Sequence, residues 1–216
     1  MSVEVLSGRP LVGVLAVQGA FAEHRAALER AGAEVVRVRT GADLAGLRGL
    51  VVPGGESTTL RVVAGESGLL HDLRAAVDGG LPVLGTCAGL IALSEEIADG
   101  DEPLIGGLDV TVRRNAYGRQ VASFEAPVEV PGLGEGPLTA VFIRAPRIER
   151  TGPEVEILAE LDGAPVAVRQ GNLMGVAFHP ELTDDLRFHE WLVDRARAHH
   201  PVLGTETKEA RRVGAQ

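Results

Sequence analysis

The sequence predicts an α/β fold of three layers, with a mostly parallel central sheet, helices on both of its faces, and antiparallel strands in the second half of the chain. Two patterns support this prediction. In the first half, apolar runs too short to be helices alternate with segments of helical spacing, as in parallel strands joined by crossover helices. In the second half, short stretches of alternating polarity are separated by glycine and proline, which is typical of hairpins.

The first half begins with Leu11–Val17, a continuous apolar run rich in β-branched residues, which predicts a strand buried on both faces. Gln18-Gly19 ends this strand, and Ala20–Ala31 follows with helical spacing until Gly32 stops it. The same alternation continues to residue 97. The further elements predicted there are a half-buried strand at Ala33–Arg39, a short helix at Ala42–Leu47, a strand at Leu50–Val52, a helical stretch containing Leu60, Val62 and Val63, a helix at Gly68–Val77, a strand at Leu81–Leu84 and a helix at Ala88–Ile97.

The second half predicts short strands that pair as antiparallel hairpins. Asp162-Gly163 is a typical two-residue hairpin turn, and Gly171-Asn172 is a weaker one. Leu186–Ala198 is amphipathic and predicts a closing helix. The strands are predicted at Leu108–Arg113, Gln120–Val130, Thr139–Ile143, Val155–Leu161, Pro165–Arg169 and Leu173–Phe178.

Charge and cysteine content narrow the classes of function. The net charge of −9 disfavours binding to the phosphates of nucleic acids. The single cysteine, Cys87, excludes an internal disulfide and the usual multi-cysteine zinc site. No signal-peptide pattern is seen at the start, and no apolar run reaches the roughly 18 residues of a membrane span. We expect one cytoplasmic domain over residues 1–200 with a polar tail over 201–216, and no metal, nucleic acid or membrane as a partner.

The most informative segment places Cys87 in a Gly-x-Cys-x-Gly pattern between a predicted strand and a predicted helix. This is the arrangement of a nucleophile elbow, with cysteine in place of serine. Gly85 and Gly89 permit a tight turn and the close approach of neighbouring chain. The helix N-terminus favours a thiolate. A lone cysteine is more often a small buried residue, but the glycines and the strand–helix context favour a nucleophile here.

A second segment, Phe178-His179-Pro180-Glu181, follows the last predicted strand. In an extended chain His179 and Glu181 would point to the same side, with Pro180 fixing the backbone between them. Glu181 would then accept a hydrogen bond from one ring nitrogen of His179 and leave the other to face a thiol. Alone, this segment is more often a surface turn, and the presence of Cys87 is what favours catalysis. The other histidines are interpreted as solvated, namely His24, His71, His189, His199 and His200.

A third segment, Val52–Thr59, ends a predicted strand with Gly54-Gly55, and Ser57 is the expected N-cap of the following helix. Such a loop presents backbone N–H groups to an anion or an oxyanion. It lacks the Gly-Lys-Ser/Thr ending of a P-loop. By itself the segment is equally consistent with an ordinary glycine-rich turn.

Together these segments resemble the triad-type glutamine amidotransferases, and in detail the family of glutaminase subunits of pyridoxal 5′-phosphate synthase. One departure is Ala116, where that family is expected to carry serine. The matching segments run in family order along almost the whole chain, at Leu15–Gly19, Pro53–Thr59, Gly85–Gly89, Arg114–Gln120, Phe142–Pro146 and Phe178–Leu182.

The resemblance implies a flavodoxin-like or Rossmann-like amidotransferase fold that hydrolyses L-glutamine to glutamate and ammonia without a cofactor. It implies that Cys87 attacks the amide carbon, that His179 takes the thiol proton and later activates water, and that Glu181 orients His179. It further implies that the ammonia passes to a separate synthase subunit, which builds pyridoxal phosphate from a pentose phosphate and a triose phosphate. The implied glutamine-binding residues are Gly55, Glu56, Ser57, Arg114, Ile143 and Arg144, with the N–H groups of Gly55 and Ala88 as oxyanion donors.

Three alternatives compete with this interpretation. One is a glutaminase subunit that serves a different ammonia acceptor, and the segments Glu56–Thr59 and Arg114–Gln120 argue against it. Another is a non-catalytic regulatory subunit on the same fold, which would not need all of Cys87, His179 and Glu181. A cysteine-based redox protein fits poorly, because the one cysteine has no resolving partner.

Overall fold

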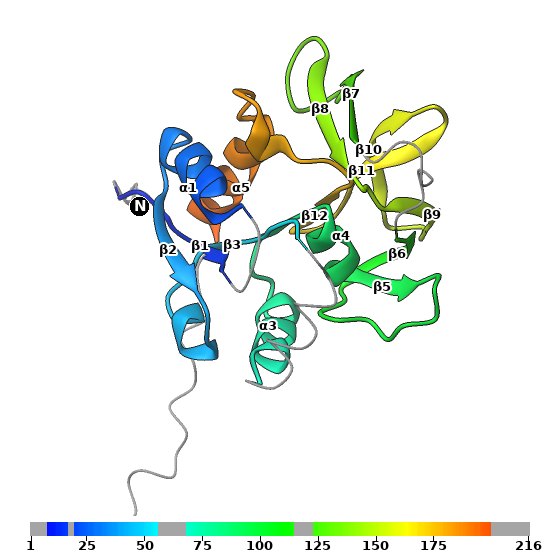
Figure 1. Cartoon of the computed structure of the whole chain (residues 1–216). Coiled ribbons are helices and arrows are strands. Elements are labelled where there is room, and N and C mark those ends of the chain that lie inside the picture. The colour runs from blue at the N-terminus through cyan, green and yellow to red at the C-terminus, as the bar shows by residue number, and fades with distance from the viewer. Residues whose placement is uncertain (1–7, 17–19, 56–67, 115–122, 200–216) are drawn as a thin grey trace, which may run out of the picture.

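A seven-stranded sheet forms the centre of the molecule in the computed structural model, which describes residues 8–16, 20–55, 68–114 and 123–199 (Figure 1). The strand order is β10-β11-β12-β4-β3-β1-β2. The pairs from β12 to β2 are parallel, whereas β10, β11 and β12 pair antiparallel. The predicted mostly parallel sheet is therefore confirmed. Its strands are β1 (Leu11–Leu15), β2 (Glu34–Val38), β3 (Gly49–Val52), β4 (Val83–Thr86), β10 (Glu156–Leu161), β11 (Ala164–Gln170) and β12 (Leu173–Val176).

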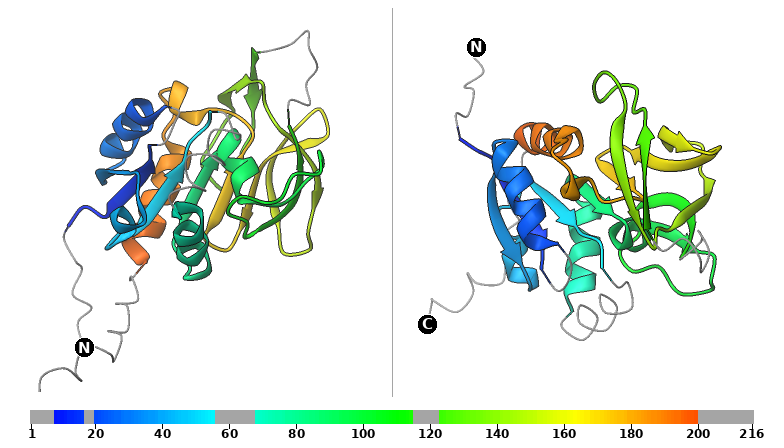
Figure 2. Two further views of the ribbon diagram at one scale, coloured as in Figure 1. Left: turned by 60° about the horizontal axis from the view of Figure 1, so that its bottom comes forward. Right: turned by 45° about the horizontal axis from the view of Figure 1, so that its top comes forward.

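Helices cover both faces of this sheet (Figures 1 and 2). Helices α1 (Phe21–Arg30) and α5 (Arg187–Ala198) contact each other and lie on one face, and α3 (Leu69–Asp78) and α4 (Ala88–Leu93) lie on the other. Every residue of β3, β4 and β12 is buried, which explains why these strands are continuous apolar runs. Within the described ranges, no helix is long and apolar enough to cross a membrane.

The second half of the chain adds two small sheets beside the central one. One contains β5 (Ser94–Ile97), β6 (Leu108–Arg113) and β9 (Arg147–Thr151), and the other pairs β7 (Ser123–Val128) with β8 (Leu138–Ile143). The predicted hairpin turns are confirmed. Asp162 and Gly163 between β10 and β11 have φ values of 52° and 74°, as a type I′ turn requires. Gly171 joins β11 to β12 with φ of 57°.

The structure corrects two secondary-structure predictions. The helix expected at Ala88–Ile97 ends at Leu93, because Ser94 adopts extended backbone and starts β5, which pairs with β6. All six residues of α4 are buried, so the apolar sequence of this helix does not mark the residue at which it ends. Strand β9 was not predicted, because its charged sequence resembles a loop, and its pairing with β6 is what makes it a strand. The predicted helical stretch near Leu60 and the tail lie outside the described residues.

Four of the few aromatic side chains form a row that reaches the functional region. The rings of Phe124 and Phe142 stack at 4.6 Å between centroids, Phe142 meets Phe178 edge-on at 5.6 Å, and Phe178 meets Phe188 at 5.4 Å. Phe178 directly precedes His179. The row therefore ties the position of that histidine to β7, β8 and α5, which come from widely separated parts of the chain.

Candidate active site

Cys87 occupies the turn between β4 and α4 with φ of 50° and ψ of −105°, which is an uncommon conformation for a residue that has a side chain. Its N–H donates to the carbonyl oxygen of Val176 at 2.8 Å. Its own carbonyl accepts a hydrogen bond from Leu90 N–H at 3.1 Å. The predicted strand–elbow–helix geometry is confirmed, and the neighbouring strand and the helix hold the strained turn in place.

Both glycines of the Gly-x-Cys-x-Gly pattern are required by close contacts. A Cβ on Gly85 would lie 2.7 Å from the carbonyl oxygen of Gly89 and from Leu93 Cδ1. A Cβ on Gly89 would overlap the carbonyl oxygen of Val52 on β3. Helix α4 can therefore sit directly on the sheet only because these two positions lack side chains, and this contact aims the Cys87 turn.

His179 and Glu181 form the predicted pair, although through a different backbone. Nδ1 of His179 lies 2.8 Å from Oε1 of Glu181, and the N–H of His179 donates to the carbonyl oxygen of Val141 on β8 at 2.9 Å. The expected extended chain was wrong, because Pro180 opens a short 3₁₀ turn, η2 (Pro180–Leu182). The proline suits the first position of that turn, where its missing N–H has no acceptor.

The electrostatics of the pair favour an imidazolium beside a carboxylate. Burial lowers the pKa of His179, but the Cys87 sulfur and the Glu181 carboxylate outweigh burial and raise that pKa to about 10. Burial raises the pKa of Glu181, but its contacts with His179 and His24 hold this pKa well below its usual value. At neutral pH the histidine can therefore hold a proton next to the thiol.

The glycine-rich loop lies against His179 and Cys87. A Cβ on Gly54 would overlap His179 Cε1 and would lie 3.3 Å from Cys87 Cβ. The N–H of Gly54 donates to Oγ1 of Thr86 at 3.1 Å, which anchors the loop to the end of β4. Gly55 has φ of 141°, a conformation that L side chains rarely adopt. Glu56 and Ser57, also expected at the glutamine site, lie outside the described residues.

The structure brings Ile143, at the end of β8, to Cys87. The Cys87 thiol donates to the carbonyl oxygen of Ile143 at 3.7 Å. Arg144, the next residue, is exposed and has φ of 45°, so a strained residue directly follows the carbonyl group that the thiol contacts. Ala88 is the first residue of α4, so its N–H has no acceptor within the helix. Their roles in binding glutamine or its oxyanion stay predictions.

Arg114 was expected to bind glutamine, but the structure places it in a cluster with two aspartates. Its guanidinium lies 3.1 Å from Oδ2 of Asp99 and 2.7 Å from Oδ2 of Asp101. The segment that follows it, 115–122, lies outside the described residues. A role for Arg114 in binding glutamine therefore stays a prediction. In the described part of the chain, no group of His, Cys, Asp or Glu is arranged to hold a metal ion.

The expectation that His24 and His189 are solvated was wrong, because both are fully buried. The rings of His24 on α1 and His189 on α5 contact each other, and Nε2 of His24 lies 3.4 Å from Oε2 of Glu181. The sequence held a signal for His24, which shares a helix face with Ala27 and Leu28, three and four residues later. His71, in contrast, is exposed as expected.

Comparison with known proteins decides the family. The model of the SNO glutamine amidotransferase family matches residues 14–198. The chain belongs to this family. A relative from Frankia casuarinae, named pyridoxal 5′-phosphate synthase subunit PdxT, is 55% identical over 88% of this chain and 96% of its own. A relative of the same name from Carboxydothermus hydrogenoformans is 48% identical over 85% of this chain and 96% of its own.

Solved structures agree with this membership. A crystal structure of a glutamine amidotransferase is 49% identical, with a TM-score of 0.81 over 86% of this chain and 98% of its own. The structure of PurLQS from Thermotoga maritima is 17% identical, with a TM-score of 0.61 over 88% of this chain and 98% of the matched one, and it shows the fold alone. The resemblance to amidotransferases inferred from the motifs is confirmed.

Proposed function

We propose that this chain is the glutaminase subunit of pyridoxal 5′-phosphate synthase and that Cys87, His179 and Glu181 are its catalytic triad. The observation that carries the proposal is the strained Cys87 turn, which lies beside a histidine whose Nδ1 is 2.8 Å from a buried carboxylate. This is the arrangement of nucleophile, base and orienting group that acyl transfer requires. Family membership supplies the substrate class, which is the side-chain amide of L-glutamine.

The reaction proceeds through a thioester. The Cys87 thiolate attacks the amide carbon while the thiol proton resides on His179, and the carbonyl oxygen becomes an oxyanion. The N–H groups of Ala88 and Gly55 would stabilise this oxyanion. When the intermediate collapses, His179 gives its proton to the leaving nitrogen and ammonia departs. His179 then takes a proton from water, which hydrolyses the thioester and releases glutamate.

Glutamine would lie in the space beside the Cys87 thiol, flanked by the end of β8 and by the glycine loop. Gly55, Glu56 and Ser57 would line one side, and Ile143, Arg144 and Arg114 would complete the site. An arginine suits the α-carboxylate of glutamine and a glutamate suits its α-ammonium group. Arg144 is an exposed residue that directly follows β8, which supports this placement.

The ammonia would pass to a separate synthase subunit that makes pyridoxal phosphate from a pentose phosphate and a triose phosphate. The names of relatives that cover 85–88% of this chain support this acceptor over one in another pathway. Such a partnership fits a cytoplasmic protein. The presence of all three residues, Cys87, His179 and Glu181, supports a catalytic role over a purely regulatory one.

We further infer that the isolated chain is a poor glutaminase and that the synthase subunit activates it. Ammonia released into water is protonated and loses its nucleophilicity, so uncoupled hydrolysis wastes glutamine. The two glycines of the Pro53–Gly55 loop permit more than one peptide orientation at low steric cost. One missing oxyanion donor lowers the rate by roughly 10²–10³-fold. Binding of the partner near this loop would select the productive orientation.

The test is glutamine hydrolysis by the chain with and without saturating synthase subunit. Activity is expected with the partner, together with labelling of Cys87 by a glutamine-like affinity reagent. His179→Asn should abolish activity, and the matched control His71→Asn, on the exposed face of α3, should not change it. No hydrolysis with any synthase subunit, or labelling elsewhere than Cys87, would refute the proposal. Full activity without the partner would refute the activation alone.

A further inference from the structure

A buried polar network continues beyond the proposed triad. Glu181 has one oxygen, Oε1, paired with His179, and its other oxygen, Oε2, is buried without a hydrogen bond of standard geometry in the described part of the chain. Nε2 of His24 lies 3.4 Å from Oε2. A buried carboxylate oxygen without a hydrogen-bond donor destabilises the folded protein. The imidazole that faces this oxygen can remove that cost by donating a hydrogen bond to it.

His24 also contacts two other buried groups. Its Nε2 lies 3.3 Å from Oγ1 of Thr86, the hydroxyl that accepts the N–H of Gly54. Its Nδ1 lies 3.1 Å from Nε2 of His189 on α5. One imidazole on α1 therefore joins the catalytic carboxylate, the anchor of the glycine loop and the closing helix.

The carboxylate determines the tautomers along this chain of contacts. An ionised carboxylate only accepts, so Nε2 of His24 must carry the hydrogen. A hydrogen on Nδ1 of His189 would be a buried donor without a partner among the described residues, so the hydrogen of this ring lies on Nε2, and Nδ1 of His24 accepts from it. Burial and the neighbouring His24 lower the pKa of His189 to about 3, so this ring is neutral. Its buried Nδ1, which has no partner among the described residues, is then an acceptor and not a stranded donor.

We propose that His24 is a positioning residue of this glutaminase, which donates from Nε2 to Oε2 of Glu181 and so directs Oε1 at His179, while His189 fixes its tautomer. The inference rests on the triad proposed above. Catalytic hydrogen bonds are often long in a free enzyme and tighten in the reacting complex. On this proposal the 3.4 Å contact between Nε2 of His24 and Oε2 of Glu181 becomes such a bond in the reacting complex, while Nε2 also lies within 3.3 Å of Oγ1 of Thr86.

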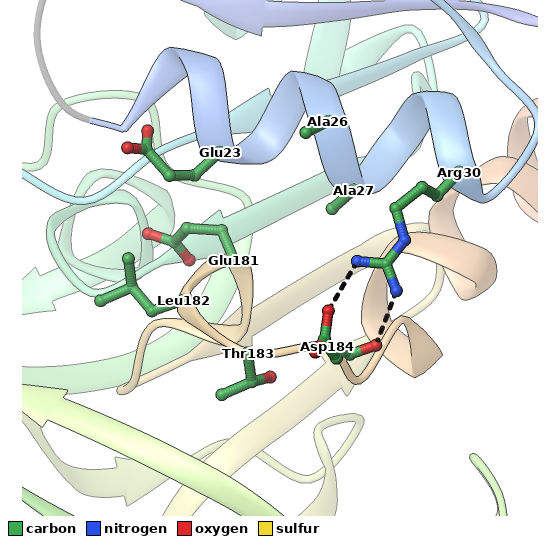
Figure 3. A pocket seen from close by; sticks show the side chains of 8 residues that line it. All are labelled: Glu23, Ala26, Ala27, Arg30, Glu181, Leu182, Thr183 and Asp184. Carbon is green, nitrogen blue, oxygen red and sulfur yellow. Dashed lines mark hydrogen bonds and ion pairs between the residues drawn. The ribbon is translucent and has the colours of Figure 1, made fainter.

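The surroundings of His24 favour this role over a purely steric one. Figure 3 shows Glu181 on η2 next to α1, at a pocket of about 460 Å³ whose lining includes Glu23 and Arg30. Glu23 is exposed, and Arg30 is paired with Asp184 at 3.0 Å. Among the described residues, Glu181 from η2 and His189 from α5 are titratable groups in contact with the buried His24 ring.

The proposal is tested with His24→Leu and His24→Gln in the full chain with saturating synthase subunit. His24→Leu removes the donor. We expect kcat to fall by about 10–100-fold, which is the usual loss when the hydrogen-bond partner of a metal-ligating side chain is removed, and we expect little change in KM. His24→Gln keeps an N–H near the position of Nε2 and should recover most of that loss. Leu28→Ala is the matched control, because Leu28 is buried four residues later on the same helix. It should lower the melting temperature without lowering kcat.

Titration of the histidine side chains, followed by ¹⁵N NMR, separates a positioning role of His24 from a purely structural one, because loss of packing alone would not change the pKa of His179. The titration midpoint of His179 should fall in His24→Leu, because a poorly held carboxylate stabilises the imidazolium less, and should not fall in Leu28→Ala. The ¹⁵N shifts of His24 and His189 should both report hydrogen on Nε2. An unchanged His179 midpoint in His24→Leu, an equal loss in His24→Gln, or an equal loss in Leu28→Ala would overturn the proposal. Activity that survives Cys87→Ala would instead overturn the proposed triad.

Discussion

Replacing Gly54 by alanine is expected to disable the site while leaving the fold intact. The new Cβ would lie 2.5 Å from Cε1 of His179, whereas carbon atoms in contact are usually about 3.5–4.0 Å apart. The imidazole would have to move by about 1 Å to relieve this overlap. It cannot do so freely, because the backbone N–H of His179 donates to the carbonyl oxygen of Val141 and the ring Nδ1 is hydrogen-bonded to Glu181.

A displacement of about 1 Å in a catalytic group costs roughly 10²-fold in rate. We therefore expect kcat to fall by about that factor, with a loss of about 1–3 kcal/mol in the free energy of unfolding from overpacking. Glutaminase kinetics with the synthase subunit and thermal unfolding of the same preparation measure both quantities. Gly8→Ala is the control, because a Cβ there meets nothing within 4 Å. If Gly54→Ala keeps the wild-type kcat, His179 is not held against this glycine and the reasoning fails.

Further substitutions probe the same site. Cys87→Ser and Cys87→Ala should abolish ammonia release with unchanged circular dichroism, and residual hydrolysis would exclude Cys87 as the nucleophile. Glu181→Gln should lower kcat by about 10–100-fold, because a hydrogen bond to a charged group contributes about 1.5–3 kcal/mol. This loss should be smaller than the loss in His179→Asn. A wild-type kcat in Glu181→Gln would contradict the orienting role of Glu181. The pKa of Glu181 is held below the usual carboxyl value of about 4.3. Its ionised form therefore stabilises the fold above that pH, and the stability difference between wild type and Glu181→Gln in urea unfolding should shrink as the pH falls from 6 to 3. A constant difference would contradict this. Gly89→Ala should destabilise the fold, since its Cβ overlaps the carbonyl oxygen of Val52, and an unchanged melting temperature would contradict the close contact.

The sequence by itself determined the architecture and the main chemical groups. Continuous apolar runs such as the one at Leu11 predict strands buried on both faces, because a parallel sheet covered by helices has no solvent-facing side. The turn at Asp162-Gly163 follows from local backbone preferences. Cys87 and the His179–Glu181 pair were found because each lies in a short local motif, although the 3₁₀ turn at Pro180 was not predicted.

Tertiary structure alone decided which distant groups meet at the site. The end of α4 at Leu93 and the strand β9 follow from pairing with β6, which leaves no local trace in the sequence. The burial of His24 and His189 results from the packing of α1 against α5, 165 residues apart in sequence. A solvated histidine and one that faces a catalytic carboxylate look alike in a sequence, because the difference lies in which helix covers the ring. The local pattern thus supplied the proposed triad, and the packing of α1 and α5 near Glu181 supplied the buried histidines that support it.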